Sequence, residues 1–345
     1  MSKKKNYQFS YLKSGVNVKL GNDLVKKIKP LSKKTLNKNV IGGIGGFGAV
    51  YELDQKRYKK PYLVSATDGV GTKILIAKEL KNYKTIGIDL VAMSVNDIIV
   101  QGAKPLFFLD YLAFADLNEK IVLDVVEGIS EACSKVNCAV IGGETATLPG
   151  VYNEGDYDVV GFMVGSVDKE NLKLRTNTKE GDILIGLPSS GLHTNGFSLV
   201  RSIFNSDDDV SVLSKKISGE SKNLGELLAE PHREYLSTID SILNLVSGIS
   251  HITGGGLRKN LPRVFSPNLV ANIKKNSWDI PPLFKYIMAE GKVSEKEMFD
   301  VFNMGVGLVL IADPSHKQEI LNACKDSWVL GEIELQKNFL FYSLQ

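Results

Sequence analysis

Segments with strand character alternate with segments of helical spacing along most of this chain, and this alternation restricts the folds it can adopt. In the first half, Tyr62–Thr67, Pro105–Ala115 and Asp158–Val167 are rich in β-branched and aromatic residues, which is typical of strands. Between them, Leu90–Val100 and Ile121–Val136 place apolar residues at helical spacing. Strands alternating with helices predict an α/β or α+β fold.

The second half repeats this alternation after a polar stretch, Asp168–Glu180. We expect, in chain order, a strand at Asp182–Leu187, helices from about Asn195 and His232, a strand ending at His251, a helix from Gly255, a strand at Leu269–Ile273, a helix at Pro282–Glu290, a strand at Val306–Ala312 and a helix at His316–Lys325. The 345 residues are enough for two domains. We therefore expect a weakly periodic N-terminal arm over residues 1–60, a first domain over 61–170 and a second over 171–345.

Composition excludes some functional classes. The chain has 42 Lys and Arg against 39 Asp and Glu, a balance too slight to indicate a nucleic-acid partner. The longest apolar runs, such as Val306–Ala312, are too short to span a bilayer, and no apolar stretch follows the lysine-rich Met1–Lys5, so neither a membrane span nor a secretory signal is expected. The 3 cysteines lack metal-ligand spacing and suit buried free thiols in a reducing cytoplasm.

A glycine-rich segment, Val40–Val50, contains a G-x-G-x-x-G pattern formed by Gly43, Gly45 and Gly48. A dinucleotide-binding fingerprint needs a buried strand before the glycines and a long helix after them. Neither Ser32–Asn39 nor Ala49–Lys60 has that character. Two interpretations remain, a linker or a flap whose backbone amides close over an anion, and the apolar Phe47 speaks against a merely solvated linker.

Acidic and amide side chains follow or flank the expected strands of the first half. Asp68 ends a strand and precedes two glycines and Lys73, which suits a polyphosphate with Mg²⁺, although a turn with a surface lysine is the simpler interpretation of the glycines alone. Asp89, Asn96 and Asp97 lie in or just before one expected helix, where at least two can share a face. On its own, Asp89 is better explained as a helix cap.

Three further segments carry polar groups next to glycines. Glu144 follows a short expected strand, Cys138–Ile141. A loop before a helix contains Ser189, Ser190, His193 and Asn195, in a setting where anions bind, although a lone histidine is more often structural. The sequence HITGGG, which contains His251, Thr253, Gly254, Gly255 and Gly256, ends a strand and opens a helix. Two places suited to phosphate indicate two phosphorylated ligands.

Taken in order, these segments resemble the phosphoribosylformylglycinamidine cyclo-ligases, a family of purine-pathway enzymes. The resemblance runs almost from end to end and is carried by YLKSGVNVKLGNDLV, GGIGGFGAVYEL, SATDGVGTK, GIDLVAMSVNDIIVQGAKPLFFLDY, GGETATLPGVY, GLPSSGLHTNGFSLVR, HITGGG and FNMGVGLVL. PLFFLDY and GLPSSGLHTNGFSLVR separate it from superfamily relatives such as selenophosphate synthetase and thiamine-phosphate kinase.

The resemblance implies a reaction and a set of site residues. ATP phosphorylates the formyl oxygen of formylglycinamidine ribonucleotide, and ring closure gives 5-aminoimidazole ribonucleotide, ADP and phosphate. It implies ATP and Mg²⁺, with the metal on Asp68, Asp89 and Asp97 and catalytic contacts from Asp68, Lys73, His193 and Asn195. The expected nucleotide contacts are Gly42, Gly43, Gly45, Gly46, Phe47, Gly48, Asp68, Gly69, Gly71, Thr72, Lys73, Asp89, Asn96 and Glu144. The expected substrate contacts are Ser189, Ser190, His193, His251, Thr253, Gly254, Gly255 and Gly256.

The resemblance also implies an architecture and marks two departures. A mixed N-terminal sheet with helices would pair with that of a second subunit into a barrel in a homodimer, beside a C-terminal α/β domain. The chain has Thr147 and Leu148 where the family usually has Glu and Met, and His232 within a stretch where the family usually reads PTRIYV. The rival interpretations are another ATP-dependent phosphotransferase of the superfamily and a nucleotide-binding subunit without catalysis.

Overall fold

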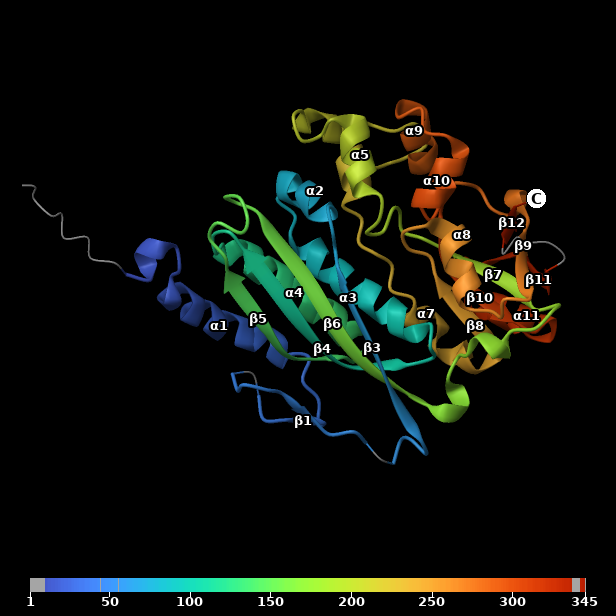
Figure 1. The fold of residues 1–345 in the computed structure, drawn as a ribbon, viewed down its shortest axis with the longest axis horizontal. Coiled ribbons are helices and arrows are strands. Elements are labelled where there is room, and N and C mark those ends of the chain that lie inside the picture. The colour runs from blue at the N-terminus through green and yellow to red at the C-terminus, as the bar shows by residue number, and fades with distance from the viewer. Residues whose placement is uncertain (1–9, 44, 55, 337–341, 345) are drawn as a thin grey trace, which may run out of the picture.

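Two β-sheets, one in each half of the chain, organise the structure. The computed structural model describes residues 10–43, 45–54, 56–336 and 342–344, so the lysine-rich Met1–Lys5 lies outside it. Figure 1 shows the sheet of the first half on one side and that of the second half on the other, with α3 reaching toward α7 and β8. Helices and sheets mix in both halves, which confirms the expected α/β class.

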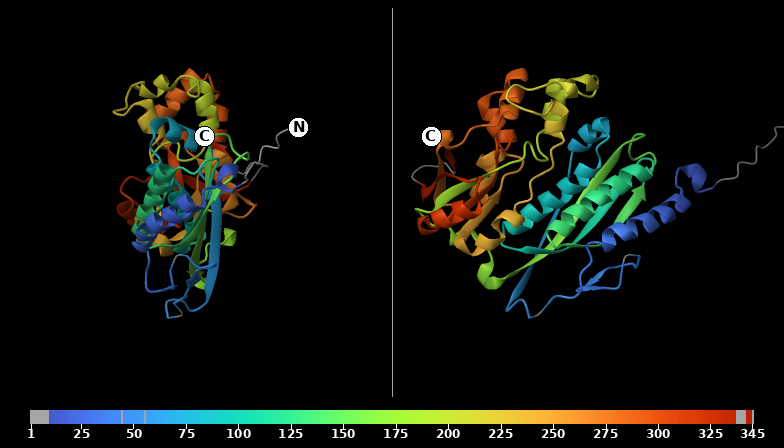
Figure 2. Two further views of the ribbon diagram at one scale, coloured as in Figure 1. Left: turned by 90° about the vertical axis from the view of Figure 1, so that its left-hand side faces the viewer. Right: turned by 180° about the vertical axis from the view of Figure 1, so that it is seen from behind.

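The first half is a four-stranded mixed sheet in the order β3-β6-β4-β5. Its strands are β3 (Pro61–Gly69), β4 (Lys104–Phe114), β5 (Ala139–Thr147) and β6 (Tyr157–Asp168), and its helices are α2 (Lys73–Leu80), α3 (Lys84–Ile99) and α4 (Glu119–Lys135). β6 runs antiparallel to β3 and β4, whereas β4 and β5 are parallel because α4 crosses between them. The side and rear views in Figure 2 show α3 and α4 over one face of this sheet.

Two glycines let α3 and α4 pack closely. A Cβ atom on Gly87 would lie 2.0 Å from the carbonyl oxygen of Val125, and one on Gly128 would lie 2.1 Å from that of Lys84. Both distances are far below van der Waals contact, so a larger residue at either position would push the helices apart. This contact fixes α3, which carries three of the expected site residues.

The second half is a six-stranded sheet in the order β12-β9-β11-β7-β10-β8. Its strands are β7 (Ile183–Pro188), β8 (Val246–His251), β9 (Leu269–Ile273), β10 (Val306–Ala312), β11 (Trp328–Leu335) and β12 (Tyr342–Leu344). Its helices are α5 (Phe197–Phe204), α6 (Leu224–Leu228), α7 (Leu236–Ile239), α8 (Gly256–Asn260), α9 (Pro282–Glu290), α10 (Glu295–Val301) and α11 (Lys317–Ala323). Neighbouring strands are antiparallel except β12 and β9. Every residue of β10 is buried, which explains its unbroken apolar sequence.

The N-terminal region is more ordered than its composition indicates. Helix α1 (Val18–Lys33) was not expected, yet Leu24, Ile28 and Leu31 lie on one face at helical spacing and pack on the core of the first half. The Asn17 side chain caps it by accepting a hydrogen bond from the Leu20 amide at 3.0 Å. Helices α2, α6 and α10 and strands β1, β11 and β12 were also missed, and α3 begins six residues before the expected start. Strand β5 ends six residues after the expected end, so Glu144 lies within the strand and does not follow it.

The glycine-rich segment forms the tip of a two-stranded ribbon. β1 (Val40–Ile41) pairs antiparallel with β2 (Val50–Tyr51), so no strand-turn-helix surrounds the glycines. This excludes the dinucleotide-binding fingerprint. Phe47 at the tip is fully exposed, and a Cβ atom on Gly42, Gly43 or Gly48 would have no atom of the described residues beyond its chain neighbours within 4 Å.

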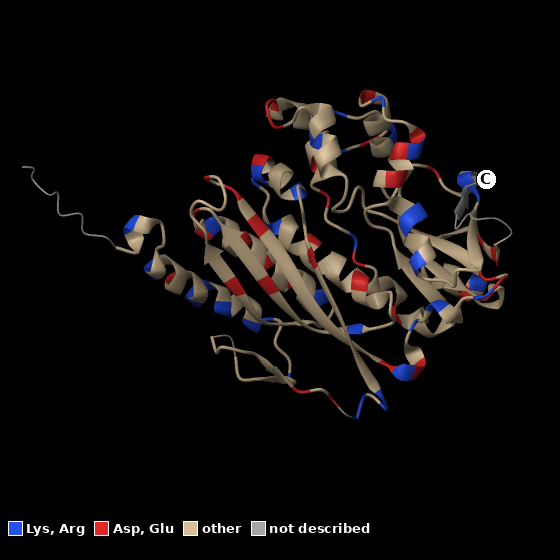
Figure 3. Cartoon of the chain, viewed as in Figure 1, with Lys and Arg blue, Asp and Glu red and all other residues tan. Residues whose placement is uncertain are grey.

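Charge and membrane features agree with the composition. Figure 3 shows basic and acidic residues interspersed in both halves of the drawn chain, without one half carrying a single sign. Within the described residues, no helix is both long and apolar enough to cross a membrane. Cys133, Cys138 and Cys324 are buried and unpaired, as expected.

Candidate active site

A polar cavity lies where the two halves meet. It has a volume of about 640 Å³ and is lined by β3, by the last turn of α3 and by the segment that leads from β8 into α8. Four of the expected site residues line it, namely Asp68, Asp97, His251 and Thr253. Further polar residues that were not predicted as site residues also line it, among them Asn260 and Arg263.

Asp68 and Asp97 present two carboxyl groups to this cavity from β3 and α3. Burial raises the pKa of the Asp68 carboxyl above its usual value; the Gly69 amide, which donates to Asp68 Oδ1 at 2.8 Å, opposes the rise, and the negative charge of Asp97 adds to it. Two carboxylates that repel each other in one polar cavity, Asp97 half-buried and Asp68 more exposed, fit a divalent cation with oxygen ligands. The donor set therefore fits Mg²⁺.

A chain of histidines runs inward from Asp97. His251 Nδ1 lies 2.9 Å from Asp97 Oδ1, and His251 Nε2 lies 3.0 Å from His232 Nε2. The His232 ring stacks on that of His193, with ring centroids 3.9 Å apart. Burial holds the pKa values of His193 and His232 well below the usual histidine value, and the neighbouring positive groups lower them further. Both rings are therefore neutral at pH 7.

Lys73 and Asp89 form a buried ion pair away from this cavity. Lys73 Nζ lies 2.8 Å from Asp89 Oδ2, and the side chains are 1% and 0% exposed. Lys73 also donates to the carbonyl oxygen of Glu230 at 2.7 Å, and the His232 amide donates to Asp89 Oδ1 at 2.6 Å. Burial raises the pKa of the Asp89 carboxyl, and the Lys73 charge opposes that rise. The pair ties the first half of the chain to the segment around His232.

The sequence grouped Asp68, Asp89 and Asp97 as metal ligands, but in the structure only Asp68 and Asp97 line the cavity. Because α3 begins at Lys84, Asp89 is internal to the helix and not a cap. Asp89 and Asn96 are seven residues apart and share one helix face, whereas Asp97 lies about 80° around the axis. Asn96 donates to the Arg233 carbonyl at 2.9 Å and accepts from the Tyr235 amide at 3.1 Å. That face of α3 binds the backbone of residues 230–235. Of Asp89, Asn96 and Asp97, only Asp97 lines the cavity.

The segment 230–235 was missed as part of the site. A helix was expected from His232, but the helix begins at Leu236 and the preceding residues have no regular structure. Pro231 and the polar run around it lack helical spacing of apolar residues, and this signal could have identified a loop.

The expected loop before α5 lies next to this segment. Ser190 Oγ donates to the Pro231 carbonyl at 2.6 Å, and the Ser190 amide donates to His193 Nε2 at 3.2 Å. Ser189 Oγ donates to Asn303 Oδ1 at 3.0 Å. His193 has φ of +60°, a conformation that non-glycine residues adopt rarely and mostly where the surroundings enforce it. Asn195 lies against Gly254, where a Cβ atom would be 3.0 Å from Asn195 Oδ1.

The HITGGG turn is held rigidly. Gly256 has φ of +57°, and a Cβ atom there would lie 2.2 Å from the Phe299 carbonyl oxygen, so glycine is required for both reasons. Asn260 Nδ2 donates to the Gly256 carbonyl at 2.8 Å and to that of Thr253 at 3.3 Å. The turn is therefore fixed beside the cavity before any ligand arrives.

Glu144 lies in a separate, smaller cavity. It lines a space of about 250 Å³ between α1 and the β4–β5 edge, together with Asp110. Burial raises the pKa of Asp110 to about 7. Asp110 was not predicted as a site residue, although an aspartate inside the apolar PLFFLDY strand is a visible signal. The structure does not place Glu144 or the glycine-rich tip in the lining of the Asp68 cavity.

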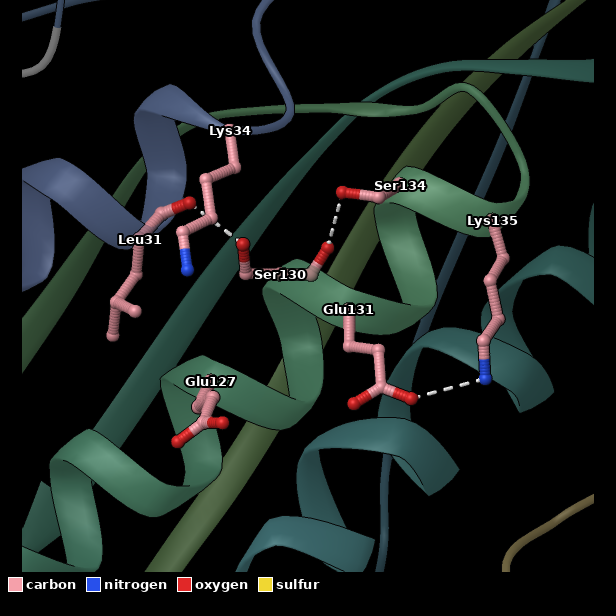
Figure 4. Close-up of a pocket in the computed structure, with 7 residues that line it drawn as sticks. All are labelled: Leu31, Lys34, Glu127, Ser130, Glu131, Ser134 and Lys135. Atoms are coloured by element: carbon pink, nitrogen blue, oxygen red, sulfur yellow. Dashed lines mark hydrogen bonds and ion pairs between the residues drawn. The ribbon is translucent and has the colours of Figure 1, made fainter.

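A further cavity, of about 470 Å³, lies between the end of α1 and α4 and is drawn in Figure 4. Several of its polar groups already have partners: Ser130 Oγ donates to the Leu31 carbonyl at 2.6 Å, and Glu131 pairs with Lys135 at 3.1 Å. None of the expected site residues lines it. It is a surface groove between two packed helices.

Comparison with known proteins identifies the family. Residues 47–167 match the sequence model described as AIR synthase related protein, N-terminal domain, and residues 179–342 match that of the C-terminal domain. A phosphoribosylformylglycinamidine cyclo-ligase from Thermoanaerobacter pseudethanolicus is 49% identical over 94% of this chain and 97% of its own length. The chain belongs to the cyclo-ligase family. Cyclo-ligases of that name from Desulfitobacterium hafniense and Methylobacillus flagellatus are 45% and 43% identical, each over 97% of this chain and over 99% and 97% of their own lengths.

Solved structures share the cyclo-ligase fold at low identity. The thiamine-monophosphate kinase of Stenotrophomonas maltophilia superposes with a TM-score of 0.67 at 15% identity, covering 93% of this chain and 95% of its own. Escherichia coli HypE superposes with a TM-score of 0.66 at 15% identity, covering 94% and 92%. At such identities the likeness concerns architecture alone, so function has to be argued from the site.

Proposed function

We propose that this chain closes the imidazole ring of 5-aminoimidazole ribonucleotide in purine biosynthesis. ATP phosphorylates the formyl oxygen of formylglycinamidine ribonucleotide, the amidine nitrogen attacks the activated carbon, and phosphate and a proton leave. The observation that carries the proposal is the cavity at which Asp68, Asp97 and the HITGGG turn meet, in a chain that matches named cyclo-ligases over nearly its whole length.

The side chains support this chemistry by positioning and by charge. Phosphoryl transfer needs aligned reactants and neutralised phosphate oxygens more than covalent help from the protein. We propose that Asp68 and Asp97 hold Mg²⁺, which would offset the charge of the triphosphate. We propose that the turn offers the backbone amides of Gly254 and Gly255 to the ribose phosphate, since the Gly256 amide donates to the Thr253 carbonyl at 3.0 Å.

His193 is our candidate for contacting the reacting amide. Its Nε2 accepts from the Ser190 amide, so the neutral ring carries its proton on Nδ1. That Nδ1 is buried and has no hydrogen-bond partner among the described residues. A buried N–H without a partner is destabilising until a ligand accepts it, and we propose that substrate oxygen does so, with Asn195 beside it.

Lys73 and Asp89 were expected to contact the nucleotide, and Asp89 to bind Mg²⁺, but we propose a different role for both. Since they pair with each other and with the backbone of residues 230–235, we propose that they support the wall of the site instead of contacting Mg²⁺. Asn96 has the same supporting role through Arg233 and Tyr235. Thr72 joins the two halves, because its Oγ1 lies 2.9 Å from Ser198 Oγ.

The glycine-rich tip and Glu144 are proposed to act on the nucleotide from outside this cavity. Phe47 is fully exposed at the tip, and we propose that the tip closes over the nucleotide and that Glu144 contacts it. We also retain, as a proposal, the division into residues 1–60, 61–170 and 171–345. Buried free thiols are compatible with the proposed cytoplasmic location.

A homodimer is supported by the open face of the four-stranded sheet. Gly161 on β6 faces α3, because a Cβ there would meet Leu90. Its neighbour Phe162 therefore points to the opposite face, and it is 41% exposed. Leu63 and Tyr111 share that face by register and are 67% and 38% exposed. Exposed apolar side chains on one sheet face are typical of an interaction surface, and we propose that a second copy covers them.

The test is a coupled measurement on the purified protein. ADP is measured with Mg²⁺-ATP in the presence and absence of formylglycinamidine ribonucleotide, and the product is measured as a diazotisable amine. Equal amounts of ADP and amine, formed only with the substrate, are expected. ATP hydrolysis without amine would refute the proposal and direct attention to another phosphate acceptor. Binding of ATP without turnover would indicate a nucleotide-binding subunit.

A further inference from the structure

The three histidines beside the site first suggest a transition-metal centre. One nitrogen from each of His193, His232 and His251 lies within 4.8 Å of the others. Two imidazoles on one tetrahedral metal hold their ring centroids about 5 Å apart, given metal–nitrogen distances near 2.0–2.1 Å. The centroids of His193 and His232 are only 3.9 Å apart, with the rings 20° from parallel. These two rings therefore cannot share a metal as they lie, and another explanation is needed.

The distances fit a directed chain of hydrogen bonds. A carboxylate only accepts, so His251 donates Nδ1–H to Asp97 Oδ1. The two contacts of His251 are both satisfied without a charged ring when its Nε2 accepts and the nitrogen 3.0 Å away, His232 Nε2, donates. His232 Nδ1 is then an acceptor, and Thr194 Oγ1 lies 3.5 Å from it. Each member of the chain has one consistent role.

Contacts hold both the backbone and the ring of His232. Its amide is bound by Asp89 at 2.6 Å, its ring stacks on His193, and its side chain is 2% exposed.

We infer that His232 is a positioning residue for the cation-binding carboxylate. Its Nε2–H fixes His251 in the tautomer that donates Nδ1–H to Asp97, and this bond orients the Asp97 carboxylate toward the cavity. The inference rests on the proposed role of Asp97 in holding Mg²⁺. Groups that orient metal ligands in this way usually change metal affinity when removed.

Two substitutions of His232 separate the hydrogen bond from the volume of the side chain. His232→Leu fills similar space without a donor, whereas His232→Gln keeps an amide N–H at about the reach of Nε2. His316→Gln, in the turn before α11, is the matched control. The chain has only 4 histidines, so the imidazole ¹⁵N signals of selectively labelled protein can be assigned by single substitutions.

Two readouts are taken on every variant. Imidazole NMR on the ligand-free protein is expected to show His251 as the Nδ1–H tautomer in the parent, in His232→Gln and in the control, and as a mixture in His232→Leu. Calorimetry with ATP at varied Mg²⁺ is expected to show an apparent Mg²⁺ affinity about tenfold weaker in His232→Leu only.

The outcomes separate this inference from the proposed function. An Nε2–H tautomer of His251 in the parent overturns the inference, as does an unchanged Mg²⁺ affinity in a folded His232→Leu protein. If His232→Leu does not fold, a loss of the Nδ1–H tautomer in His232→Gln overturns it and its retention supports it. Failure to form the amine product would refute the proposed function, while the tautomer and Mg²⁺ measurements would still decide the role of His232.

Discussion

Removing Lys73 tests the claim that a buried ion pair supports the wall of the site. In a Lys73→Met protein, Asp89 keeps its negative charge in a place that is 0% exposed, with only the His232 amide as partner. Breaking a buried pair by removing one member costs about 3–5 kcal/mol, because the remaining charge is uncompensated. The Glu230 carbonyl also loses its donor. We therefore expect a loss of unfolding free energy of about 3–5 kcal/mol.

The pair should behave as one unit. In the double variant Lys73→Met/Asp89→Leu no charge is left behind, so its stability should exceed that of Lys73→Met alone, although the His232 amide loses its acceptor.

The pH dependence of the Lys73→Met protein has a defined sign. Without the Lys73 charge, burial raises the folded-state pKa of Asp89 further. An acid with a raised folded-state pKa contributes to stability at low pH, and this contribution is lost as the pH rises through that pKa. The deficit of Lys73→Met should therefore be smaller at pH 5 than at pH 8.

Urea unfolding, followed by circular dichroism and by tryptophan fluorescence, measures these differences. Lys84→Met is the control, because Lys84 pairs with Glu127 and Glu131 on the surface, at 2.9 Å and 3.1 Å. Exposed pairs contribute about 0–1 kcal/mol. A Lys73→Met protein as stable as Lys84→Met, or a double variant no more stable than Lys73→Met, would contradict the reasoning.

Three further predictions concern other parts of the molecule. Asp68→Asn should lower kcat for amine formation by about 10²-fold or more, because a charge on the proposed Mg²⁺ site is lost, while its unfolding curve should match that of the parent. The pKa of Asp110 is about 7 in the folded protein and about 3.9 in the unfolded chain, so this residue contributes to stability at low pH and the contribution is lost as the pH rises through 7. Asp110→Asn should therefore flatten the decline in unfolding free energy between pH 5 and 8, measured by urea unfolding. Phe162→Asp should shift the species measured by light scattering toward the monomer, and a dimer that persists would argue against the open sheet face as the interface.

Sequence periodicity located most of the buried elements of the fold, because burial on one or both faces leaves a regular apolar pattern. Strand β10 is buried throughout and was placed within its observed bounds. Helix α1 was hidden by the many lysines of its exposed face, although Leu24, Ile28 and Leu31 were spaced correctly. Short elements such as α2 lack enough residues for a period to be recognised.

The candidate site was only partly predictable for a different reason. Asp68, His251 and Thr253 were identified because they lie at the end of an expected strand or next to glycines, and Asp97 because an expected helix carries several oxygen ligands; the structure places all four around one cavity. His232 was noticed only as a departure from a family pattern. Its contacts with Asp89 and His251 span 143 and 19 residues, and no local pattern specifies such pairs.

The two faces of α3 explain why residues with similar chemistry have different positions in the site. Asp89 and Asn96 are seven residues apart, so they face the same way and hold the backbone of residues 230–235 by both its amides and its carbonyls. Asp97 is adjacent in sequence but faces the cavity and receives His251. A shift of α3 by one residue would put Ile88 or Leu90 in the place of Asp89 and would turn Asp97 away from the cavity. The same shift would bring an isoleucine to the position of Gly87, where even a Cβ atom would lie 2.0 Å from the Val125 carbonyl oxygen. The register of one helix therefore determines both which carboxylate can meet a cation and where the second half of the chain is anchored.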